Sequence, residues 1–310
     1  MSEEIEAVDI TCCASCGVAE IDDIKLTECD GCDLVRYCSD ECQQEHKSVH
    51  DEACKKRGAE LRDEILFKQP ESTHYGDCPI CSLPLPVDPR KSSICHSCSK
   101  VVCNGCDHAN IMREMERRLQ HTCPFCRESL PETDEEDERR RMKRIEANDP
   151  VAMVQEGTEQ YQKGEYECAF GYWTKAAELG DAEAHYKLAE MYHHRHGIEN
   201  EKGKYHWEEA AIGGHPGARY MLGCVEWKNG NYDGAMNYRN AERAVRHWII
   251  SATQGYDSAI KMLMKAFKVA CACKQGFLTK DDLAATLRAH KAAVDATKSP
   301  QREEAELATR

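Results

Sequence analysis

The chain has 310 residues, enough for two or three domains, and carries a formal net charge of −14 at pH 7. No apolar run reaches the ~18 residues that a membrane span needs, and the acidic start, Met1 to Glu6, does not have the basic and apolar segments of a secretory signal. We therefore expect an intracellular protein, cytoplasmic or nuclear, that keeps its thiols reduced and does not bind membranes. The acidity argues against nucleic-acid partners, because a protein binds their phosphates through its own lysine and arginine side chains.

Cysteines are concentrated near the N-terminal end, where sixteen of the twenty lie within the first 126 residues. Fifteen of these and one histidine form two consecutive patterns of eight, built largely from Cys-x2-Cys pairs. This spacing lets two thiolates bind one tetrahedral Zn²⁺ without straining the backbone. The patterns therefore indicate structural zinc and not a disulfide framework. We expect four Zn²⁺ ions, two in each pattern.

The first pattern lies in residues 12–54. Its segment from Arg36 to Gln43 reads RYCSDECQ, and Ser39 followed by two acidic residues predicts a helix start there. Together with the His50-x3-Cys54 spacing, this segment resembles a MYND-type zinc finger. The resemblance implies that the ligands of two zinc ions interleave, with Cys13, Cys16, Cys38 and Cys42 at one ion and Cys29, Cys32, His50 and Cys54 at the other.

Some positions in this finger leave alternatives open. Cys12 is an alternative first ligand, but its spacing to the next cysteine is a poorer match, so we interpret it as a spare thiol. His46 shares a helix face with His50 and competes with it, although the spacing to the neighbouring cysteines favours His50. Lys47 stands where the family usually has tryptophan, which argues against a peptide groove of the family type. Residues 55–77 are expected to be a connector.

The second pattern lies in residues 78–127. Its first and last ligand pairs read Cys78-Pro79-Ile80-Cys81 and Cys123-Pro124-Phe125-Cys126, and these pairs resemble those of a RING-type finger. The resemblance implies cross-bracing, with Cys78, Cys81, Cys103 and Cys106 at one zinc and Cys95, Cys98, Cys123 and Cys126 at the other. Cysteine stands where RING fingers usually have histidine, and His96 remains an alternative to Cys95 or Cys98.

Between the ligands of the second finger, Ile111, Met115 and Leu119 recur every four residues. This period predicts a helix, and we expect its apolar face to pack against the zinc core.

The RING resemblance also implies a mode of action. In that family the finger recruits a ubiquitin-conjugating enzyme and positions its thioester without covalent chemistry of its own. By position, Ile80 and Pro124 would contact that enzyme. Arg127, directly after the last ligand, matches the cationic residue that bridges enzyme and ubiquitin in active members. Elsewhere the sequence has no phosphate-binding loop, nucleophile elbow or metalloprotease motif.

Residues 128–149 are rich in charge. Glu135, Glu136 and Asp137 each precede an arginine by four positions, a spacing that stabilises a helix through ion pairs. We expect a solvated linker helix that ends near Asp149 and Pro150, since proline suits the first turn of a new helix.

The pattern Trp-x2-[Ala/Ser]-Ala-x2-Gly-x3-Ala-x3-Leu occurs three times in residues 150–296. Its copies begin at Trp173, Trp207 and Trp248. The tryptophan and the small residues share one helix face, the glycine ends that helix in a left-handed turn, and the alanine and leucine lie on one side of the next helix. The pattern resembles Sel1-like repeats, relatives of tetratricopeptide repeats, which implies stacked helix pairs.

Helices at about 152–162 and 166–179 would open this array, and one at about 279–296 would close it. Residues 297–310 are expected to form a flexible tail. Four cysteines of this region have no partner with ligand spacing, so we expect them in the apolar core: Cys168, Cys224, Cys271 and Cys273.

The predicted fold is thus two small zinc-stabilised α+β fingers with cross-braced ligands, followed by an all-α helical-repeat solenoid. The predicted protein binds zinc and other proteins. One hypothesis is a RING-type E3 ubiquitin ligase that recruits a conjugating enzyme and selects a peptide or protein substrate through its MYND and Sel1-like surfaces. The alternative is a non-catalytic scaffold or adaptor.

The zinc prediction can be tested by chelation. Removing metal should unfold residues 13–126, because metal binding supplies most of the folding free energy of such fingers, while the repeat region keeps its helices. Limited proteolysis and circular dichroism at 222 nm before and after chelation measure the two effects. Melting of the repeat helices by the chelator would contradict a domain boundary near residue 150.

Overall fold

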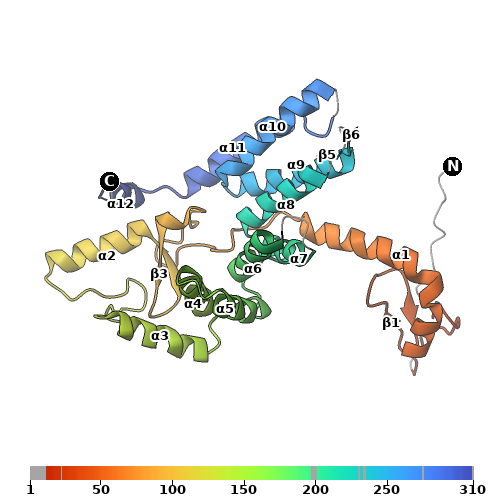
Figure 1. Cartoon of the computed structure of the whole chain (residues 1–310), viewed down its shortest axis with the longest axis horizontal. Coiled ribbons are helices and arrows are strands. Elements are labelled where there is room, and N and C mark those ends of the chain that lie inside the picture. The colour runs from red at the N-terminus through yellow and green to blue at the C-terminus, as the bar shows by residue number, and fades with distance from the viewer. Residues whose placement is uncertain are drawn as a thin grey trace. The chain divides into compact units, whose positions relative to one another are not determined.

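The computed structural model describes residues 12–21, 23–196, 201–229, 231–232, 235–273 and 276–308. They divide into two compact units, one ending at Lys68 and one beginning at Gln69. Small cysteine-rich modules come first and a largely helical region follows (Figure 1). Among the residues described, no helix combines the length and apolar character needed to cross a bilayer.

The first unit consists of a short hairpin and one long helix. Strands β1 (Thr27–Glu28) and β2 (Arg36–Tyr37) pair antiparallel, and α1 runs over Asp40–Leu66. The predicted cap at Ser39 is confirmed, since its side chain accepts a hydrogen bond from the Cys42 amide. Asp40 and Glu41 add negative charge where the helix dipole favours it. The first half of the expected connector is therefore a continuation of the ligand-bearing helix.

The second finger is built on a β-hairpin followed by a helix. After a 3₁₀ turn at Pro89–Lys91, strands β3 (Ser92–Cys95) and β4 (Lys100–Cys103) pair antiparallel, and α2 runs over Asn104–Glu116. The buried apolar residues around the cysteines are few, chiefly Leu85 and Val102. Thiols thus take the place of an ordinary hydrophobic core.

The orientation of α2 differs from the prediction. Met115 is 60% and Leu119 53% exposed, and Ile111 is 36% exposed, so the expected packing of these residues against the zinc core is wrong. The buried face carries Asn110 and Glu114 instead. These side chains satisfy backbone groups of the last ligand loop, and an unpaired buried amide there would cost more than exposed apolar surface.

Helix α3 (Asp134–Glu146) is the predicted charged helix, but it is docked and not simply solvated. Two of the three expected ion pairs form, Glu136–Arg140 and Asp137–Arg141. Arg141 is buried and also donates to Glu156 at 2.8 Å, and Arg144 donates to the Ser99 hydroxyl at 2.8 Å. The helix therefore joins the second finger to the helices that follow.

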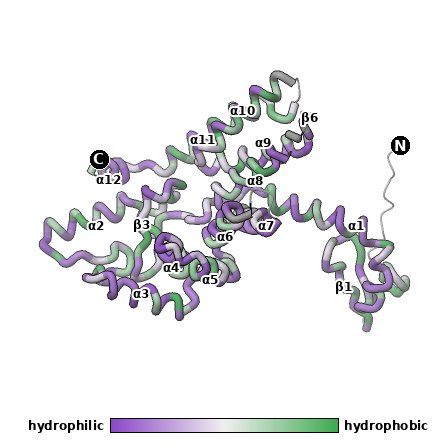
Figure 2. Tube along the Cα trace, in the orientation of Figure 1, coloured by the Kyte–Doolittle hydropathy of each residue, from purple (hydrophilic) through white to green (hydrophobic). Residues whose placement is uncertain are grey.

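Eight further helices follow in sequence order, each in contact with its neighbours. They are α4 (Pro150–Gln162), α5 (Tyr166–Glu178), α6 (Ala182–His196), α7 (Glu201–Ile212), α8 (Pro216–Asn229), α9 (Tyr238–Thr253), α10 (Asp257–Cys273) and α11 (Lys280–Ala296). The short strands β5 (Asn231–Tyr232) and β6 (Ala235–Met236) separate α8 from α9. Figure 2 shows hydrophobic and hydrophilic residues mixed along these helices, as amphipathic packing requires.

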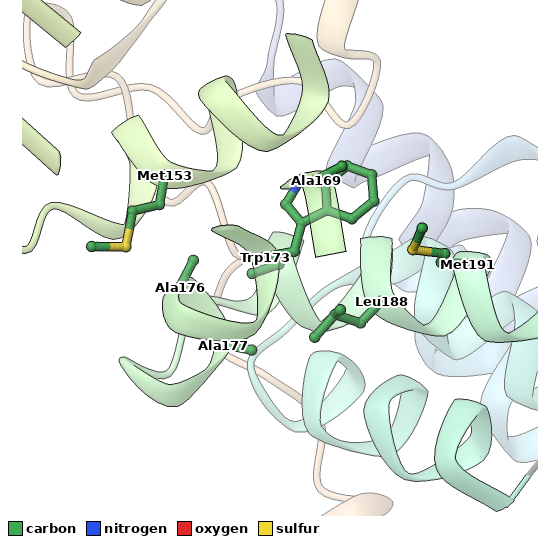
Figure 3. Close-up of a cluster of buried hydrophobic side chains, with 8 residues drawn as sticks. Met153, Ala169, Trp173, Ala176, Ala177, Leu188 and Met191 are labelled. Carbon is green, nitrogen blue, oxygen red and sulfur yellow. The ribbon is translucent and has the colours of Figure 1, made fainter. Parts of the chain in front are cut away.

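The repeated residues of the sequence pattern lie where the pattern predicts. All three tryptophans are buried, and so are the alanine and leucine of each following helix. The three glycines that end the first helices have left-handed backbones, with φ of 82° at Gly180, 85° at Gly214 and 91° at Gly255. Figure 3 shows Trp173 with Ala176, Ala177 and Leu188 in one such cluster.

The chain beyond residue 297 was expected to be flexible, but residues Pro300–Ala308 form helix α12, which packs on α2 (Figure 1). Arg302 and Ala305 are buried in this contact. The periodicity of so short a charged segment gives no sign of a long-range partner, so the sequence did not indicate docking.

The expectation of buried cysteines also fails in part. Cys168 and Cys271 are exposed and Cys224 is half-buried. The side chain of Cys273 lies outside the described residues.

Two glycine substitutions test the tryptophan packing. A Cβ at Gly223 would lie 2.4 Å from the Trp248 Nε1 atom, whereas a Cβ at Gly171 would meet nothing within 4 Å. Alanine in a helix normally gains ~1 kcal/mol over glycine, but overpacking costs about 1–3 kcal/mol. Gly223→Ala should therefore lower the free energy of unfolding, and Gly171→Ala should leave it unchanged or raise it. Urea unfolding followed at 222 nm measures both, and equal effects would contradict the packing account.

Candidate metal centres

The first group of ligands lies at the entry to α1. Cys13 and Cys16 come from the first loop, and Cys38 and Cys42 lie on either side of the helix start. The Sγ atoms of Cys16 and Cys38 are 3.5 Å apart, and those of Cys38 and Cys42 are 3.6 Å apart. These distances exceed a disulfide bond of ~2.05 Å and approach the ~3.8 Å edge of a tetrahedron with Zn–S bonds of ~2.3 Å.

The second group contains Cys29 and Cys32 from the loop after β1, and His50 and Cys54, one turn apart on α1. The His50 Nε2 atom lies 3.1 Å from the Cys32 Sγ, and the Cys29 and Cys54 Sγ atoms are 3.6 Å apart. Gly31 is required here, because a Cβ would lie 2.8 Å from the Cys54 Sγ. Along the chain, ligands of the two groups interleave.

The alternative ligands of this finger lie apart from the two groups. His46 Nδ1 is 3.1 Å from the Tyr37 hydroxyl, and its ring stacks on that of His50 with centroids 5.8 Å apart. His46 thus supports the ligand His50 and does not join the group itself. Cys12 lies outside both groups.

The third group, in the second finger, joins Cys78, Cys81, Cys103 and Cys106. Three of the four are buried, and the Cys81 and Cys103 Sγ atoms are 3.8 Å apart. The Cys103 amide approaches the Cys78 Sγ at 3.5 Å, which favours a thiolate there.

The fourth group brings together Cys95, Cys98 and Cys123, with the Cys98 and Cys123 Sγ atoms 3.8 Å apart. Cys126, the fourth expected ligand, donates its amide to the Cys123 Sγ at 3.4 Å, but its own Sγ lies 3.1 Å from the Ser97 hydroxyl. The structure therefore brings together three of the four expected ligands of this site.

The alternative ligand in this finger, His96, contacts a carboxylate and no cysteine group. Its Nδ1 atom lies 2.8 Å from each carboxylate oxygen of Asp137 on α3, so it lies outside the fourth group.

Four of the Cys-x2-Cys pairs share one backbone turn. The residue after the second cysteine has a left-handed backbone, and its amide donates to the carbonyl of the first cysteine at 2.7–3.0 Å. The residues in this position are Gly17, Ser82, Ser99 and Arg127. A non-glycine residue rarely adopts this conformation. The three turns with serine or arginine at this position therefore indicate that the ligand geometry overrides the backbone preference of the residue.

In three of the groups, hydrogen bonds from backbone amides favour the thiolate form of one cysteine. Burial would raise the pKa of Cys13, Cys78 and Cys123, but backbone amides lower it to about 6, about 7 and about 7. Hydrogen bonds with neighbouring thiols raise the pKa of Cys38 to about 12, and burial raises that of Cys98 to about 11. Because Zn²⁺ binds the thiolate, it must displace the protons of thiols with a raised pKa, such as Cys38 and Cys98.

The donor sets fit Zn²⁺ at all four groups, as predicted from the spacing: sulfur with one imidazole, at tetrahedral separations. The first three groups each have four protein ligands, so those sites are closed, and the metal would serve the fold and leave no open position for substrate.

The three residues expected to meet a conjugating enzyme have different surroundings. Ile80 is 42% exposed in the first ligand loop. Pro124 is buried and lines a pocket of about 480 Å³ beside α3, whereas its neighbour Phe125 is 42% exposed. Arg127 is exposed, and its guanidinium donates to the Asn110 side-chain oxygen at 2.7 Å.

Sequence reasoning missed the polar network beneath this loop. The Asn110 side-chain amide donates to the Thr122 carbonyl at 3.0 Å, and the buried Glu114 accepts from the Thr122 hydroxyl at 2.6 Å and from its amide at 3.2 Å. These bonds hold the pKa of Glu114 below its usual value against the effect of burial. The only sequence signal was the i, i+4 spacing of Asn110 and Glu114.

His74, Glu183 and His215 form a further group with metal-ligand atoms. Its geometry does not suit a metal. The Nε2 atoms of His74 and His215 both approach the Glu183 Oε2 atom, at 3.3 Å and 3.1 Å, so the carboxylate oxygen occupies the point on which the two imidazoles converge. The His215 Nδ1 atom accepts from the Ala218 amide, which leaves its Nε2 proton to bond Glu183 at 3.1 Å. The group is a polar contact between the segment before the second finger and the repeat helices.

Comparison with protein families gives one match, the MYND finger, to residues 13–54. The first finger is therefore a MYND finger, a module that mediates protein–protein interaction. The match covers the eight ligands of the first two groups. A search of curated proteins finds no match to the chain.

The thiol pKa values predict how zinc binding depends on pH. Each all-cysteine group has at least two thiols whose pKa is raised in the metal-free finger, such as Cys95 and Cys98. Zinc binding near neutral pH should release at least about two protons per such site, so the affinity should fall at least about a hundredfold per pH unit as pH decreases. Isothermal titration calorimetry in buffers of different ionisation enthalpy counts these protons. An affinity independent of pH between 6 and 8 would contradict the assignment.

Proposed function

We propose that the protein is a RING-type E3 ubiquitin ligase whose MYND finger and helical repeats select its substrate. The observation that carries the proposal is the second finger: a hairpin and a helix surrounded by two interleaved cysteine groups, with Ile80 exposed in the first ligand loop. The arrangement supports a RING assignment by topology and ligand order, with cysteine in every ligand position.

The exposed side chains of the two ligand loops support a docking surface for a conjugating enzyme. Ile80 presents an aliphatic side chain from the first loop and Phe125 an aromatic one from the last loop, each 42% exposed. Because Pro124 is buried, we assign its expected role to Phe125. Large exposed apolar residues on a small finger favour a protein interface.

Arg127 has the position of the residue that would bridge enzyme and ubiquitin. Its left-handed backbone, with φ of 65°, sets the start of the side chain, and the hydrogen bond from its Nη1 atom to Asn110 fixes one edge of the guanidinium. The guanidinium has further donors and faces solvent, so it could hydrogen-bond two carbonyl groups of bound partners. Preorganisation of this kind lowers the entropic cost of binding.

The two other modules would select the substrate. We propose that α4 to α11 form a Sel1-like solenoid, which the buried tryptophans and left-handed glycines support. In the MYND finger the surface around the second ligand group, beside α1, carries Asp30, Asp40, Asp51 and Lys47 around a depression that the ligands Cys29, His50 and Cys54 also line. With lysine in place of an aromatic residue and three carboxylates around it, this surface favours a polar, basic peptide over an apolar one.

A non-catalytic scaffold is the second candidate. It is favoured by the burial of Pro124 and by the bond that engages Arg127 with Asn110, because both reduce the surface that the family uses for enzyme contact.

An autoubiquitination assay with a panel of conjugating enzymes tests the proposal. Ile80→Ala and Arg127→Ala should each reduce chain formation by at least about tenfold, since a central interface residue contributes about 1–2 kcal/mol or more. Met115→Ala and Arg117→Ala serve as matched controls, because both residues are exposed in the same finger away from the ligand loops.

Zinc content is measured in every variant of this assay. Activity lost in fully metallated Ile80 and Arg127 variants, and kept in the controls, would support the ligase. Fully metallated wild-type protein that transfers no ubiquitin with any enzyme would favour the scaffold.

A further inference from the structure

The C-terminal helix α12 packs on the end of α2 that bears zinc ligands. Arg302 and Cys81 are separated by 221 positions in the sequence, yet the Arg302 Nη2 atom lies 3.5 Å from the Cys81 Sγ. Cys81 belongs to the third ligand group. The contact therefore joins a remote part of the chain to a metal centre.

The Arg302 side chain also donates hydrogen bonds to backbone carbonyls of the first ligand loop of the second finger. Its Nη1 atom donates to the Pro84 carbonyl at 2.8 Å and its Nη2 atom to the Leu83 carbonyl at 3.3 Å. A further bond to the Thr297 carbonyl at 2.6 Å fixes the guanidinium against the end of α11. The arginine is only 6% exposed, so its guanidinium is fixed in position and largely shielded from solvent.

The close approach of α12 depends on Gly105, which lies between the ligands Cys103 and Cys106. A Cβ at this position would lie 2.8 Å from the Arg302 amide nitrogen and 2.8 Å from its Cγ. No larger residue fits without moving the helix. The ion pair of Lys91 with Glu306, at 2.7 Å, and the buried Ala305 hold the other end of α12.

The charge of the site explains why an arginine is favourable there. Four thiolates around one Zn²⁺ carry a net charge of −2, and a buried negative site needs a compensating cation or donor. Burial raises the pKa of the Cys103 thiol, and a hydrogen bond with Arg302 opposes that increase. A guanidinium can bond a sulfur and two carbonyls at once, which a lysine ammonium does less well.

We propose that Arg302 is an outer-sphere partner of the third zinc centre and that α12 is a structural part of the second finger, so that this centre holds its metal only with the C-terminal helix in place. The inference concerns metal retention and does not depend on ubiquitin transfer. Ile80, in the same loop, stays 42% exposed, so the brace leaves the proposed docking residue accessible.

Thiol alkylation of the full-length zinc-loaded protein tests this inference at single sites. The protein is exposed to a chelator and an alkylating reagent, and each cysteine is followed by peptide mass spectrometry. In Arg302→Ala the four cysteines of the third group should react about tenfold faster, since an outer-sphere partner contributes about 10–100-fold to metal affinity. Glu304→Ala is the control, because Glu304 is exposed on the same helix.

Two further comparisons keep the test decisive. Arg302→Lys should give an intermediate rate, because it keeps the charge but loses the planar fork, and it serves in place of the alanine variant if that protein does not fold. Third-group rates in the arginine variants that equal those of Glu304→Ala would overturn the proposal. A uniform increase over all the ligand cysteines would also overturn it, since that result would indicate a general loss of stability.

Discussion

The tetrahedral grouping of thiols is the interaction on which the N-terminal half of this protein depends. In the second finger the buried residues are largely the ligands themselves, and only a few aliphatic side chains accompany them. Such a segment cannot bury enough apolar surface to offset its conformational entropy. Binding of metal to preformed sulfur groups supplies that free energy instead. Left-handed residues at Ser82, Ser99 and Arg127 are tolerated because the metal sites determine the turns.

The elements around the second finger attach to it through polar contacts. Arg144 of α3 reaches the Ser97 carbonyl and the Ser99 hydroxyl, Glu114 of α2 satisfies Thr122, and Arg302 of α12 grips the first ligand loop. Each of these side chains replaces water at a backbone group or hydroxyl near a ligand. Because an unsatisfied buried polar group costs about 1–3 kcal/mol, the contacts fix the loops in one arrangement. The finger is thereby integrated with helices that come much later in the chain.

Local patterns indicated which cysteines lie close together, Cys126 excepted, and where the helix pairs of the repeated pattern turn. Cys-x2-Cys spacing reports directly on metal geometry, and the repeat from Trp173 to Leu188 encodes one helix pair within a short stretch of sequence. Ser39 was predicted as a helix cap for the same reason, since capping depends on a few adjacent residues. The MYND match confirms the family of the first finger.

Long-range contacts were not predictable in the same way. Arg141 was expected in a solvated linker, but its partner Glu156 lies in another helix. Helix α2 shows the limit of periodicity: the apolar stripe at Ile111 and Met115 was taken for the core face, whereas Asn110 and Glu114 face the finger. The docking of Arg302 depends on Gly105 being small, and the sequence alone gives no reason to pair these two residues.

X-ray absorption spectroscopy of the purified full-length protein at the zinc edge, combined with a zinc count, tests the central claim most directly. The account predicts four zinc ions with fifteen sulfur ligands and one nitrogen ligand among them and Zn–S distances of about 2.3 Å. A first shell rich in nitrogen or oxygen, or a stoichiometry of two zinc ions or fewer, would contradict it.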